Sequence, residues 1–322
     1  MTPELDELER CIVGALQVDG RATWRAIASA LQVPERRIAV RGQALLNSNR
    51  VRVSAVQSGG ERVVVRLWCA PGASEGVAEE LASRGDASFV YATLGTSDVL
   101  AELRVGGRPG STASLLTDLG TIPGLIRADT SPVARVFKQQ NEWRPGLLST
   151  EQEQIVAADR KVADGGSGRT GEPLSDRDRE VLRILAENGR ASYEELARRC
   201  RISEATARRW VLTWVGDSFI TTHVHVEPEL LGLPVQLLSL LSVDPAHVEA
   251  LGSSLSHDPC VRYAVGLFGR HQMLVESAHA SQAAAYGFLS AVSGLAPGMH
   301  AIETSVVIVT KHHRSRVSAV SA

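Results

Sequence analysis

Apolar residues recur at helical spacing in two separate stretches of the chain. In the first stretch, residues 5–46, Leu5, Leu8 and Ile12 follow one another at intervals of three and four positions. Such spacing places apolar side chains on one face of a helix. The pattern continues through two further segments separated by tight turns, and it recurs over residues 174–215. Each stretch therefore predicts three short helices packed around a small core.

The two stretches correspond position by position without a gap. Gly20 aligns with Gly189 and Arg21 with Arg190, and each pair lies 169 positions apart. An alternating segment, residues 51–56, follows the first stretch and predicts a short strand or wing. A constant repeat distance over a whole structural unit indicates two copies of one motif. We therefore expect two winged helix-turn-helix units.

Local signals predict where the first helix of each copy begins. Thr2 and Pro3 suit the start of a helix over residues 2–17. Ser175 followed by Asp178 resembles a capping pair at the start of the second copy. We therefore expect a side chain in each copy to accept a backbone N–H at this point.

After each helical stretch the spacing of the apolar positions changes to that of strands. Residues 62–137 predict the order β-α-β-β-α-β, with the second helix over residues 111–119, and residues 235–309 repeat the order. This order matches the ferredoxin-like arrangement, in which two helices cover one face of a sheet. We expect the free faces of the two sheets to pack against each other. The expected fold class is α+β, with two winged helix-turn-helix units and two ferredoxin-like βαββαβ units in tandem.

A glycine-rich run, Asp164–Glu172, predicts a flexible linker between the two copies. The expected domains are a helix-turn-helix over 1–58, a ferredoxin-like unit over 60–140, a linker over 141–173, a second helix-turn-helix over 174–226 and a second ferredoxin-like unit over 233–313.

Composition and charge narrow the class of protein. Hydrophobic residues make up 44% of the 322 residues and charged residues 22%, as in soluble globular proteins. No apolar run reaches the ~18 residues of a membrane span, and the acidic N-terminus is unlike a signal peptide. The four cysteines are far apart, so we expect reduced thiols and a cytoplasmic location. Because the net charge is −2, nucleic-acid binding requires local basic faces.

Basic side chains gather on the last helix of each copy and on the turn before it. A helix-turn-helix lays this helix in the major groove, where arginine pairs with guanine or with phosphates. The plain alternative is a solvated helix face. The candidate DNA-binding residues are Arg36, Arg37, Arg41 and Gln43 in the first copy, and Arg199, Arg201, Thr206, Arg208 and Arg209 in the second.

These segments resemble the Lrp/AsnC family of transcription regulators over nearly the whole chain, twice. The resemblance rests on Leu5-Asp6, Asp19-Gly20-Arg21 and Val33-Pro34, and again on Leu174-Ser175, Asn188-Gly189-Arg190 and Ile202-Ser203. It implies double-stranded DNA as the partner. It also implies α+β units that bind amino acids and mediate assembly.

The chain departs from the family pattern in three ways. Ordinary members carry one such unit and form dimers and octamers, so two units in one chain imply an intramolecular pseudo-dimer, with further homo-oligomers through its outer surfaces. Gly42 lies inside the last helix of the first copy, at a cost of about 1 kcal/mol relative to alanine. Trp210 stands where arginine is usual. We therefore expect two unequal recognition helices and an asymmetric operator.

The resemblance also implies an effector site at the turn between the second and third strands of each α+β unit, with a Gly-x-x-Asp signature. In the first unit a carboxylate and backbone amides would hold the two charged ends of an amino acid. The alternative for Asp98 is a turn residue that accepts backbone N–H groups. The candidate residues are Gly95, Thr96, Ser97 and Asp98, and in the second unit Gly269, Arg270, His271 and Gln272.

The histidines give no spacing typical of a metal site. His223 and His225 lie two apart on a predicted strand, and His312 and His313 end another. The phosphate-loop and hydrolase motifs that we sought are not in the sequence, so we expect neither cofactor nor metal and no enzyme. The favoured function is a sequence-specific transcription regulator responsive to an amino acid or related metabolite. Two alternatives stay open: an enzyme like the siroheme decarboxylases, which resemble this family in fold, or a metabolite sensor with vestigial DNA-binding units.

Overall fold

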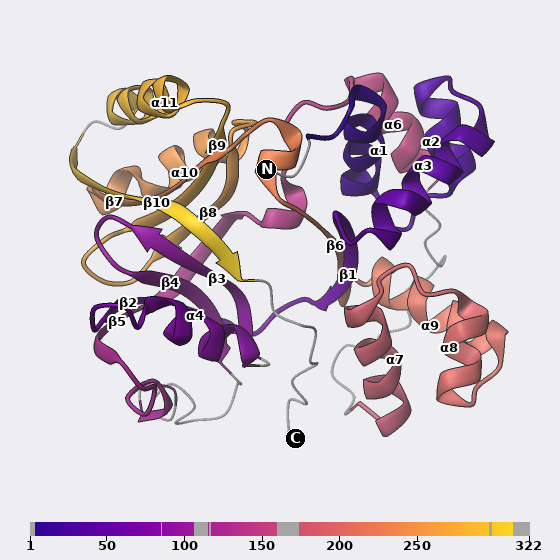
Figure 1. The fold of residues 1–322 in the computed structure, drawn as a ribbon, viewed down its shortest axis with the longest axis horizontal. Helices are drawn as coiled ribbons and strands as arrows, with labels where there is room; N and C mark the ends of the chain where they lie inside the picture. The colour runs from indigo at the N-terminus through magenta and orange to yellow at the C-terminus, as the bar shows by residue number, and fades with distance from the viewer. Residues whose placement is uncertain are drawn as a thin grey trace. The chain divides into compact units, whose positions relative to one another are not determined.

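The computed structural model describes residues 4–84, 86–105, 115, 117–159, 174–295 and 298–311, and it has a mixed α+β fold (Figure 1). The chain divides into two compact units. Among the described residues, the helical unit holds those up to Gly59 together with those of Arg144–Leu231, and the barrel unit holds those of Gly60–Trp143 together with those from Gly232 to position 311. Each unit is thus assembled from two separate stretches of sequence. The glycine-rich run, most of the predicted helix over 111–119, and the pair His312 and His313 lie outside the described residues.

The helical unit contains two sets of three helices, each followed by a strand. The first triad is α1 (Glu7–Val18), α2 (Trp24–Leu31) and α3 (Glu35–Asn47), followed by β1 (Val51–Gln57). The second triad is α7 (Asp176–Glu187), α8 (Tyr193–Cys200) and α9 (Glu204–Gly216), followed by β6 (Ile220–Val226) and the short 3-10 helix η2 (Pro228–Leu231).

The first helix begins later than the predicted residue 2. Asp6 caps α1 by accepting the N–H of Glu9 at 2.9 Å, and the Glu9 carboxylate accepts the N–H of Asp6 at 3.1 Å. Because this reciprocal pair satisfies two backbone donors at once, it is a stronger start signal than Thr2. At the start of the second triad, Ser175 and Asp178 make the predicted capping pair.

Strands β1 and β6 pair with each other in an antiparallel ribbon. In this register Val51 faces Val226, Ser54 faces His223 and Gln57 faces Ile220. Ser54 and His223 also lie 169 positions apart, so equivalent positions of the two triad-and-strand segments meet at the centre of the ribbon. The register is the one that a local two-fold axis between the triads requires.

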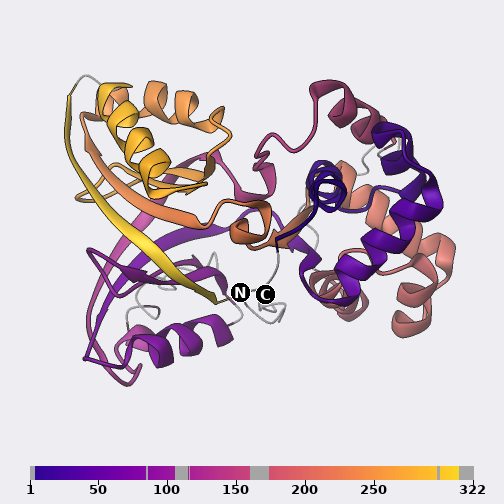
Figure 2. The ribbon, with the colours of Figure 1, turned by 45° about the horizontal axis from the view of Figure 1, so that its top comes forward.

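One further helix, α6 (Thr150–Ala158), packs against α1 and α2 of the first triad (Figure 2). Val156 of α6 is fully buried. In the second triad, Trp214 is buried, and half-buried Trp210 packs against it with ring centroids 5.8 Å apart and ring planes tilted by 32°. Both tryptophans therefore pack in the core of the second triad.

The barrel unit is a closed eight-stranded sheet with the strand order β10-β3-β4-β2-β5-β8-β9-β7. Its first half contains β2 (Glu61–Cys69), α4 (Ser74–Ser83), β3 (Ala87–Leu94), β4 (Val99–Val105), β5 (Leu125–Lys138) and the short η1 (Gln140–Glu142). Its second half contains β7 (Val235–Val243), the short η3 (Pro245–His247), α10 (Val248–Ser256), β8 (Val261–Leu267), β9 (Met273–His279), α11 (Gln282–Leu295) and β10 (Met299–Lys311).

The two halves join at both edges, where β5 pairs with β8 and β10 pairs with β3. Apolar side chains from both halves, such as Leu100 and Leu238, share one core inside the barrel. Helices α4 and α10 pack on the outer side of their own strands (Figure 1). Edge pairing leaves neither half with an open strand edge, which removes a site of non-specific pairing.

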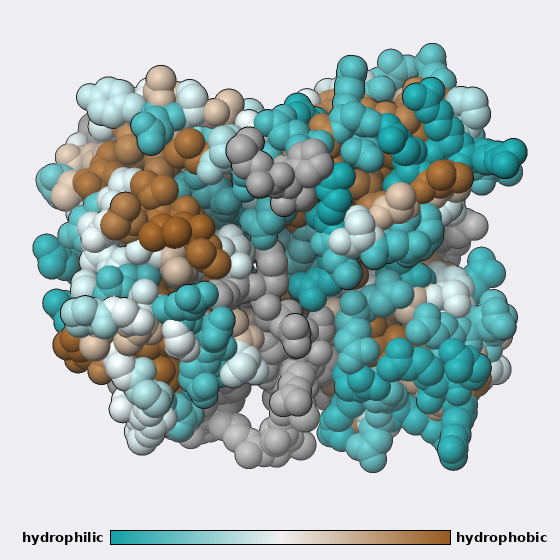
Figure 3. Space-filling model, viewed as in Figure 1, coloured by the Kyte–Doolittle hydropathy of each residue, from teal (hydrophilic) through white to brown (hydrophobic). Residues whose placement is uncertain are grey.

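An apolar area lies on the outer surface of the barrel unit (Figure 3). Leu94 faces Val306 where β3 pairs with β10, and both side chains are exposed, as is Ile308. In the part of the chain that the structure describes, the helices are too short or too polar to cross a membrane.

Candidate DNA-binding surface and effector region

Helix α3 presents part of the predicted basic surface to solvent. Arg36, Arg37 and Gln43 are exposed, whereas Ile38 on the opposite face is fully buried. The Gln43 amide donates to the side-chain oxygen of Asn47 at 2.9 Å, which holds both polar side chains along one ridge of the helix. Three of the four candidates in the first triad therefore share a solvent-facing surface.

Arg41, the fourth candidate, is turned toward α1. Its guanidinium pairs with the carboxylate of Asp6 and lies 3.7 Å from that of Glu9. Asp6 is the residue that caps α1. The backbone N–H of Glu9, donated to its carboxylate, lowers the pKa of Asp6; burial raises that pKa, and the charge of Arg41 lowers it further. Arg41 thus ties the third helix of the triad to the start of the first.

Three arginines of the second triad are exposed, Arg208 and Arg209 on α9 and Arg201 in the turn before it. Arg201 adopts the left-handed conformation with φ of 54°, and Gln32 occupies the equivalent turn of the first triad with the same φ. Because the two turns have the same backbone geometry, the angle between α2 and α3 resembles that between α8 and α9.

The remaining two candidates of the second triad have partners within the protein. The hydroxyl of Thr206 lies 2.8 Å from that of Ser203, the capping residue of α9, and its N–H donates to Ser203. Arg199 lies 3.4 Å from the Glu195 carboxylate and 3.7 Å from that of Glu187. Thr206 therefore supports the start of α9, and Arg199 belongs to an ion-pair network.

The unusual glycine within α3 has a packing reason. A Cβ at Gly42 would lie 2.4 Å from a carbon of the Trp24 ring, so the close contact between α2 and α3 requires a residue without a side chain. The equivalent positions of the second triad hold Tyr193 and Val211. The two triads therefore fill the same space with different pairs of residues.

Two arginines that the sequence marked only as aligned positions connect the triads. Arg21 donates to backbone carbonyls in the turn before α8, and Arg190 donates to carbonyls in the turn before α2. The Gly-Arg motif in both turns was the only sequence feature that singled out these arginines. Nothing in the neighbouring sequence shows that each arginine contacts the other triad.

In the barrel unit, Asp98 and Gln272 hold equivalent places in the two predicted effector turns, 174 positions apart. The Asp98 carboxylate accepts the N–H of Cys69 at 2.7 Å, and the Gln272 side-chain oxygen accepts the N–H of Val243 at 3.1 Å. Burial, and then the charge of Asp98, raise the pKa of the Cys69 thiol. Both side chains thus tie the third strand of their half to the end of the first.

The other residues of the first turn rest on β10. The Thr96 N–H donates to the Ser305 hydroxyl at 3.0 Å, and a Cβ at Gly95 would lie 2.8 Å from the Thr304 carbonyl oxygen. The Ser97 carbonyl accepts the hydroxyl of Thr93 at 2.6 Å. The turn is therefore held by the opposite half of the barrel.

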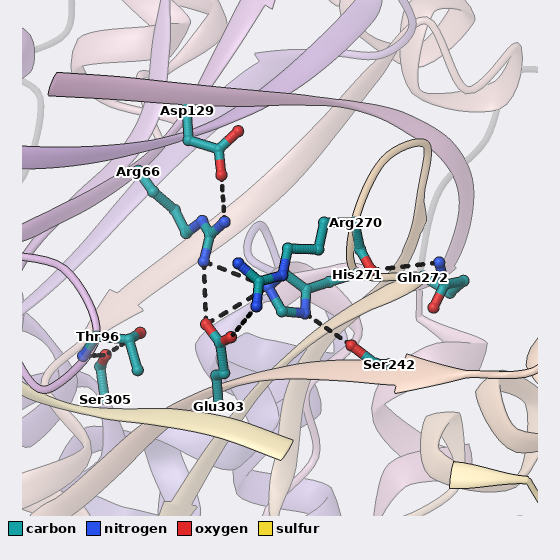
Figure 4. A network of polar contacts seen from close by, with 9 residues as sticks. All are labelled: Arg66, Thr96, Asp129, Ser242, Arg270, His271, Gln272, Glu303 and Ser305. Carbon is teal, nitrogen blue, oxygen red and sulfur yellow. Dashed lines mark hydrogen bonds and ion pairs between the residues drawn. The ribbon is translucent and has the colours of Figure 1, made fainter. Parts of the chain in front are cut away.

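The second turn belongs to a polar cluster formed by Arg66, Asp129, Ser242, His271 and Glu303 (Figure 4). The buried Arg66 guanidinium pairs with Asp129 and lies 3.3 Å from the Glu303 carboxylate. His271 is 2% exposed; its Nδ1 lies 3.0 Å from the Ser242 hydroxyl and its Nε2 3.4 Å from Glu303. Burial lowers the pKa of His271 against the opposing charge of Glu303, so the ring is neutral at neutral pH.

Arg270 and Gln272 flank this cluster. Arg270 is 77% exposed, with its guanidinium 3.7 Å from Glu303. A Cβ at Gly269 would lie 3.3 Å from the Ser131 hydroxyl oxygen. The Gln272 side-chain amide donates to the backbone carbonyl of Gly269 at 3.2 Å. Arg66 is not among the residues predicted from the sequence, although an arginine inside the apolar run 63–68 is a usable signal of a buried ion pair.

Two buried glutamates pair with tyrosines across the barrel. Tyr91 of the first half donates to Glu276 of the second at 3.0 Å, and Tyr263 of the second half donates to Glu102 of the first. Burial and then the neighbouring carboxylate raise the pKa of each tyrosine well above its usual value. Both tyrosines therefore remain donors over the whole neutral range. Within the described residues, no group of three or more possible metal-ligating side chains converges.

The family model of an AsnC-type helix-turn-helix domain matches residues 174–210, which run from the residue before the Ser175 cap into α9. An uncharacterised HTH-type transcriptional regulator of Pyrococcus furiosus is 31% identical over 140 residues, which are 42% of this chain and 95% of that protein. The chain belongs to the Lrp/AsnC family. It is therefore a helix-turn-helix transcriptional regulator, more than twice the length of this relative.

Among solved structures, the siroheme decarboxylase NirDL matches 95% of this chain and 92% of its own, with a TM-score of 0.59 and 12% identity. Escherichia coli AsnC matches 42% of this chain and 93% of its own, with a TM-score of 0.39 and 22% identity. At such identities the likeness to NirDL concerns the fold alone.

Proposed function

We propose that this Lrp/AsnC regulator binds DNA with both of its triads, so that one chain supplies both halves of the binding site. The observation that carries the proposal is the β1–β6 ribbon, in which Ser54 faces its own equivalent His223. In family members with a single unit, such an axis would relate two subunits. One fused chain then presents two helix-turn-helix units as a dimer does.

The same proposal describes the chain as a tandem duplication of a winged helix-turn-helix and a ferredoxin-like unit. In the barrel, the strands of the second half follow those of the first by 174 positions, and both halves have the strand order 2-3-1-4. Equivalent residues also share roles, as Asp129 and Glu303 do around Arg66. Each of these correspondences supports descent from one repeated unit.

The proposed base and phosphate contacts are the exposed residues of the two recognition helices and of the turn before the second. Arg41, Arg199 and Thr206 have protein partners, so we assign them the role of holding the helices in place. Since the two sets differ, the proposed operator is asymmetric. The contact residues are Arg36, Arg37 and Gln43 in the first triad and Arg201, Arg208 and Arg209 in the second.

A gel-shift assay on the promoter region of the protein's own gene tests the proposal. We expect Arg36→Ala/Arg37→Ala and Arg208→Ala/Arg209→Ala each to weaken or redirect binding, and each lost phosphate contact to lower the salt slope by about 1. Arg135→Ala is the control, because its side chain is 64% exposed and lies in the barrel unit. Wild-type binding by both double variants would refute DNA reading by these helices.

We propose the turns Gly95–Asp98 and Gly269–Gln272 as the contact region for an amino acid or related metabolite. Asp98 already accepts a backbone N–H, so the positive charge for an effector carboxylate comes from Arg270, which is 77% exposed and lies 3.7 Å from Glu303. Calorimetry with the common amino acids, on wild type and Arg270→Ala, tests this. Equal heats from both proteins would remove Arg270 from the effector site.

Further assembly of the chains is proposed through the outer surface of the barrel, where Leu94, Val306 and Ile308 are exposed. Light scattering of wild type and Ile308→Glu tests this surface, since a buried charge would weaken an interface there. An unchanged mass for the variant would exclude this patch.

Two outcomes would favour other functions. A visible absorption band on adding a tetrapyrrole, without DNA binding, would favour an enzyme; calorimetric amino-acid binding without a DNA shift would favour a sensor. In the barrel unit the buried His271 and His279 each lie within hydrogen-bond distance of a serine hydroxyl, at 3.0 and 2.9 Å, so binding of a tetrapyrrole by either ring would have to replace that contact.

A further inference from the structure

The turn between the first and second helices of each triad has the sequence Asp/Asn-Gly-Arg-Ala. The side chain of Asp19 accepts the N–H of Arg21 at 2.9 Å, and that of Asn188 accepts the N–H of Arg190 at 3.0 Å. Such a bond closes the turn locally and fixes the backbone from which the arginine side chain extends. Both arginines therefore leave their turns in one defined direction.

Arg21 extends across the local two-fold axis into the second triad. One terminal nitrogen donates to the carbonyl of Gly189 and the other to the carbonyl of Ala191 at 3.0 Å. The guanidinium also lies over the ring of Tyr193, 5.2 Å from its centroid. Two donors in a rigid fork match two carbonyls that are two residues apart, which fixes the angle as well as the distance between the partners.

Arg190 makes the equivalent contacts in the opposite direction, from the second triad to the first. It donates to the carbonyl of Gly20 at 2.7 Å and to that of Ala22 at 3.0 Å, and it lies 4.5 Å from the centroid of the Trp24 ring. Burial, and then the nearby charge of Arg21, lower its pKa to about 10, so it stays protonated at neutral pH. The exchange of contacts between equivalent residues is the pattern of an isologous interface.

The turns also rest directly on the ribbon. The Gly189 N–H donates to the Val53 carbonyl at 2.8 Å, and a Cβ at Gly189 would lie 2.8 Å from the carbonyl carbon of Ser54. Backbone atoms cannot move aside as the end of a flexible side chain can, so only glycine fits where the turn contacts the ribbon this closely. Each turn leads into α2 or α8, which pack on α3 and α9, so the position of the turns sets that of the recognition helices.

We propose that Arg21 and Arg190 are positioning residues that set the distance and angle between the two recognition helices, and thereby the spacing of the DNA half-sites that the chain accepts. The inference rests on the proposed function, because half-site spacing has meaning only if both triads bind DNA. It assigns the arginines no contact with DNA. Their role is to hold the two recognition helices in a fixed relative position.

The test uses the full chain and DNA selected by the wild type from a random pool. Insertion of 5 bp between the half-sites turns one of them by about half a helical turn, and we expect wild-type affinity to fall at least about tenfold. In Arg21→Lys/Arg190→Lys we expect a fall of less than about threefold, because lysine keeps the charge but cannot span two carbonyls in fixed geometry. Arg177→Ala, an exposed position on α7, is the control and keeps wild-type spacing dependence.

Hydrogen exchange on the DNA-free proteins supplies a second readout. We expect the amides of β1 and β6 to exchange at least about tenfold faster in the double lysine variant than in wild type. Wild-type spacing dependence and unchanged exchange in that variant would overturn the inference while DNA binding stands. If the wild type selects no DNA, the proposed function fails, and unchanged ribbon exchange would show separately that the arginines do not position the triads.

Discussion

Replacing Gly42 with alanine is expected to destabilise the first triad, although this change normally stabilises a helix. Alanine is preferred over glycine inside a helix by about 1 kcal/mol. At this position the new Cβ would lie 2.4 and 2.5 Å from two carbons of the Trp24 ring. The ring also has the Arg190 guanidinium 4.5 Å from its centroid, so its displacement would disturb the contact between the triads.

The second triad indicates how large the effect is and how to relieve it. Forcing an extra methyl into a packed site costs about 1–3 kcal/mol, which exceeds or cancels the helical gain of alanine. The second triad pairs Tyr193 with Val211 at the positions of Trp24 and Gly42. Gly42→Val should therefore be costly alone and better tolerated with Trp24→Tyr, with a coupling of about 0.5–3 kcal/mol as contacting residues show.

The assay is urea unfolding followed by far-UV circular dichroism on wild type, on the single variants Gly42→Ala, Gly42→Val and Trp24→Tyr, and on the double variant Gly42→Val/Trp24→Tyr. The helical unit must give a resolved transition, because a chain of two units need not unfold in one step. A Gly42→Ala protein about 1 kcal/mol more stable than wild type would refute the steric argument. Strict additivity of Gly42→Val and Trp24→Tyr would refute the claim that the two triads fill one space in alternative ways.

Three further predictions concern the barrel and α6. Because burial holds the pKa of His271 below 6.5, the unfolded chain takes up the proton first, so stability falls with pH below about 6.5; thermal melts should show a flatter slope for His271→Gln, and an equal slope would contradict this. Tyr263→Phe leaves the buried Glu102 carboxylate without its donor, and urea unfolding should show a loss of about 1–3 kcal/mol, not a neutral change. Val156→Asp puts a charge at a fully buried site, so proteolysis within α6 should quicken severalfold; a wild-type rate would mean that α6 stays docked.

Local order was predictable because it depends on neighbours in the sequence. Leu8 and Ile12 of the predicted helical spacing lie in α1, although Leu5 precedes its Asp6 cap, and the alternation over 51–56 places β1 within one residue of its end. The partner of β1 was not predictable, because a strand's pattern does not name the strand that it pairs with. β6 lies more than 160 positions further along the chain. Only the observed register shows that Ser54 pairs with His223, the residue at the equivalent position 169 residues later.

The candidate site shows the same limit for side chains. Arg41 has the type and place of a DNA contact, but Asp6, 35 positions earlier, holds it. Asp98 has the type and place of an effector ligand, but it accepts the N–H of Cys69, as Gln272 does for Val243. A residue type at a family position therefore predicts a location on the fold, while the use of its charge depends on partners that only tertiary packing brings near.

The segment that packs over the first triad distinguishes it from the second triad. Cys11 donates weakly to the Leu147 carbonyl before α6, and a Cβ at Gly14 would lie 3.0 Å from the Leu147 side chain, so this face of α1 is small and apolar where the linker crosses it. The equivalent positions on α7 are Glu180 and Arg183, which form an ion pair 2.5 Å long near solvent. A segment docked there would bury both charges at a cost that the pair recovers only with ideal geometry. Small residues at positions 11 and 14 thus admit Leu147, just before α6, to the first triad, whereas the charged pair at the equivalent positions of the second triad disfavours such a contact.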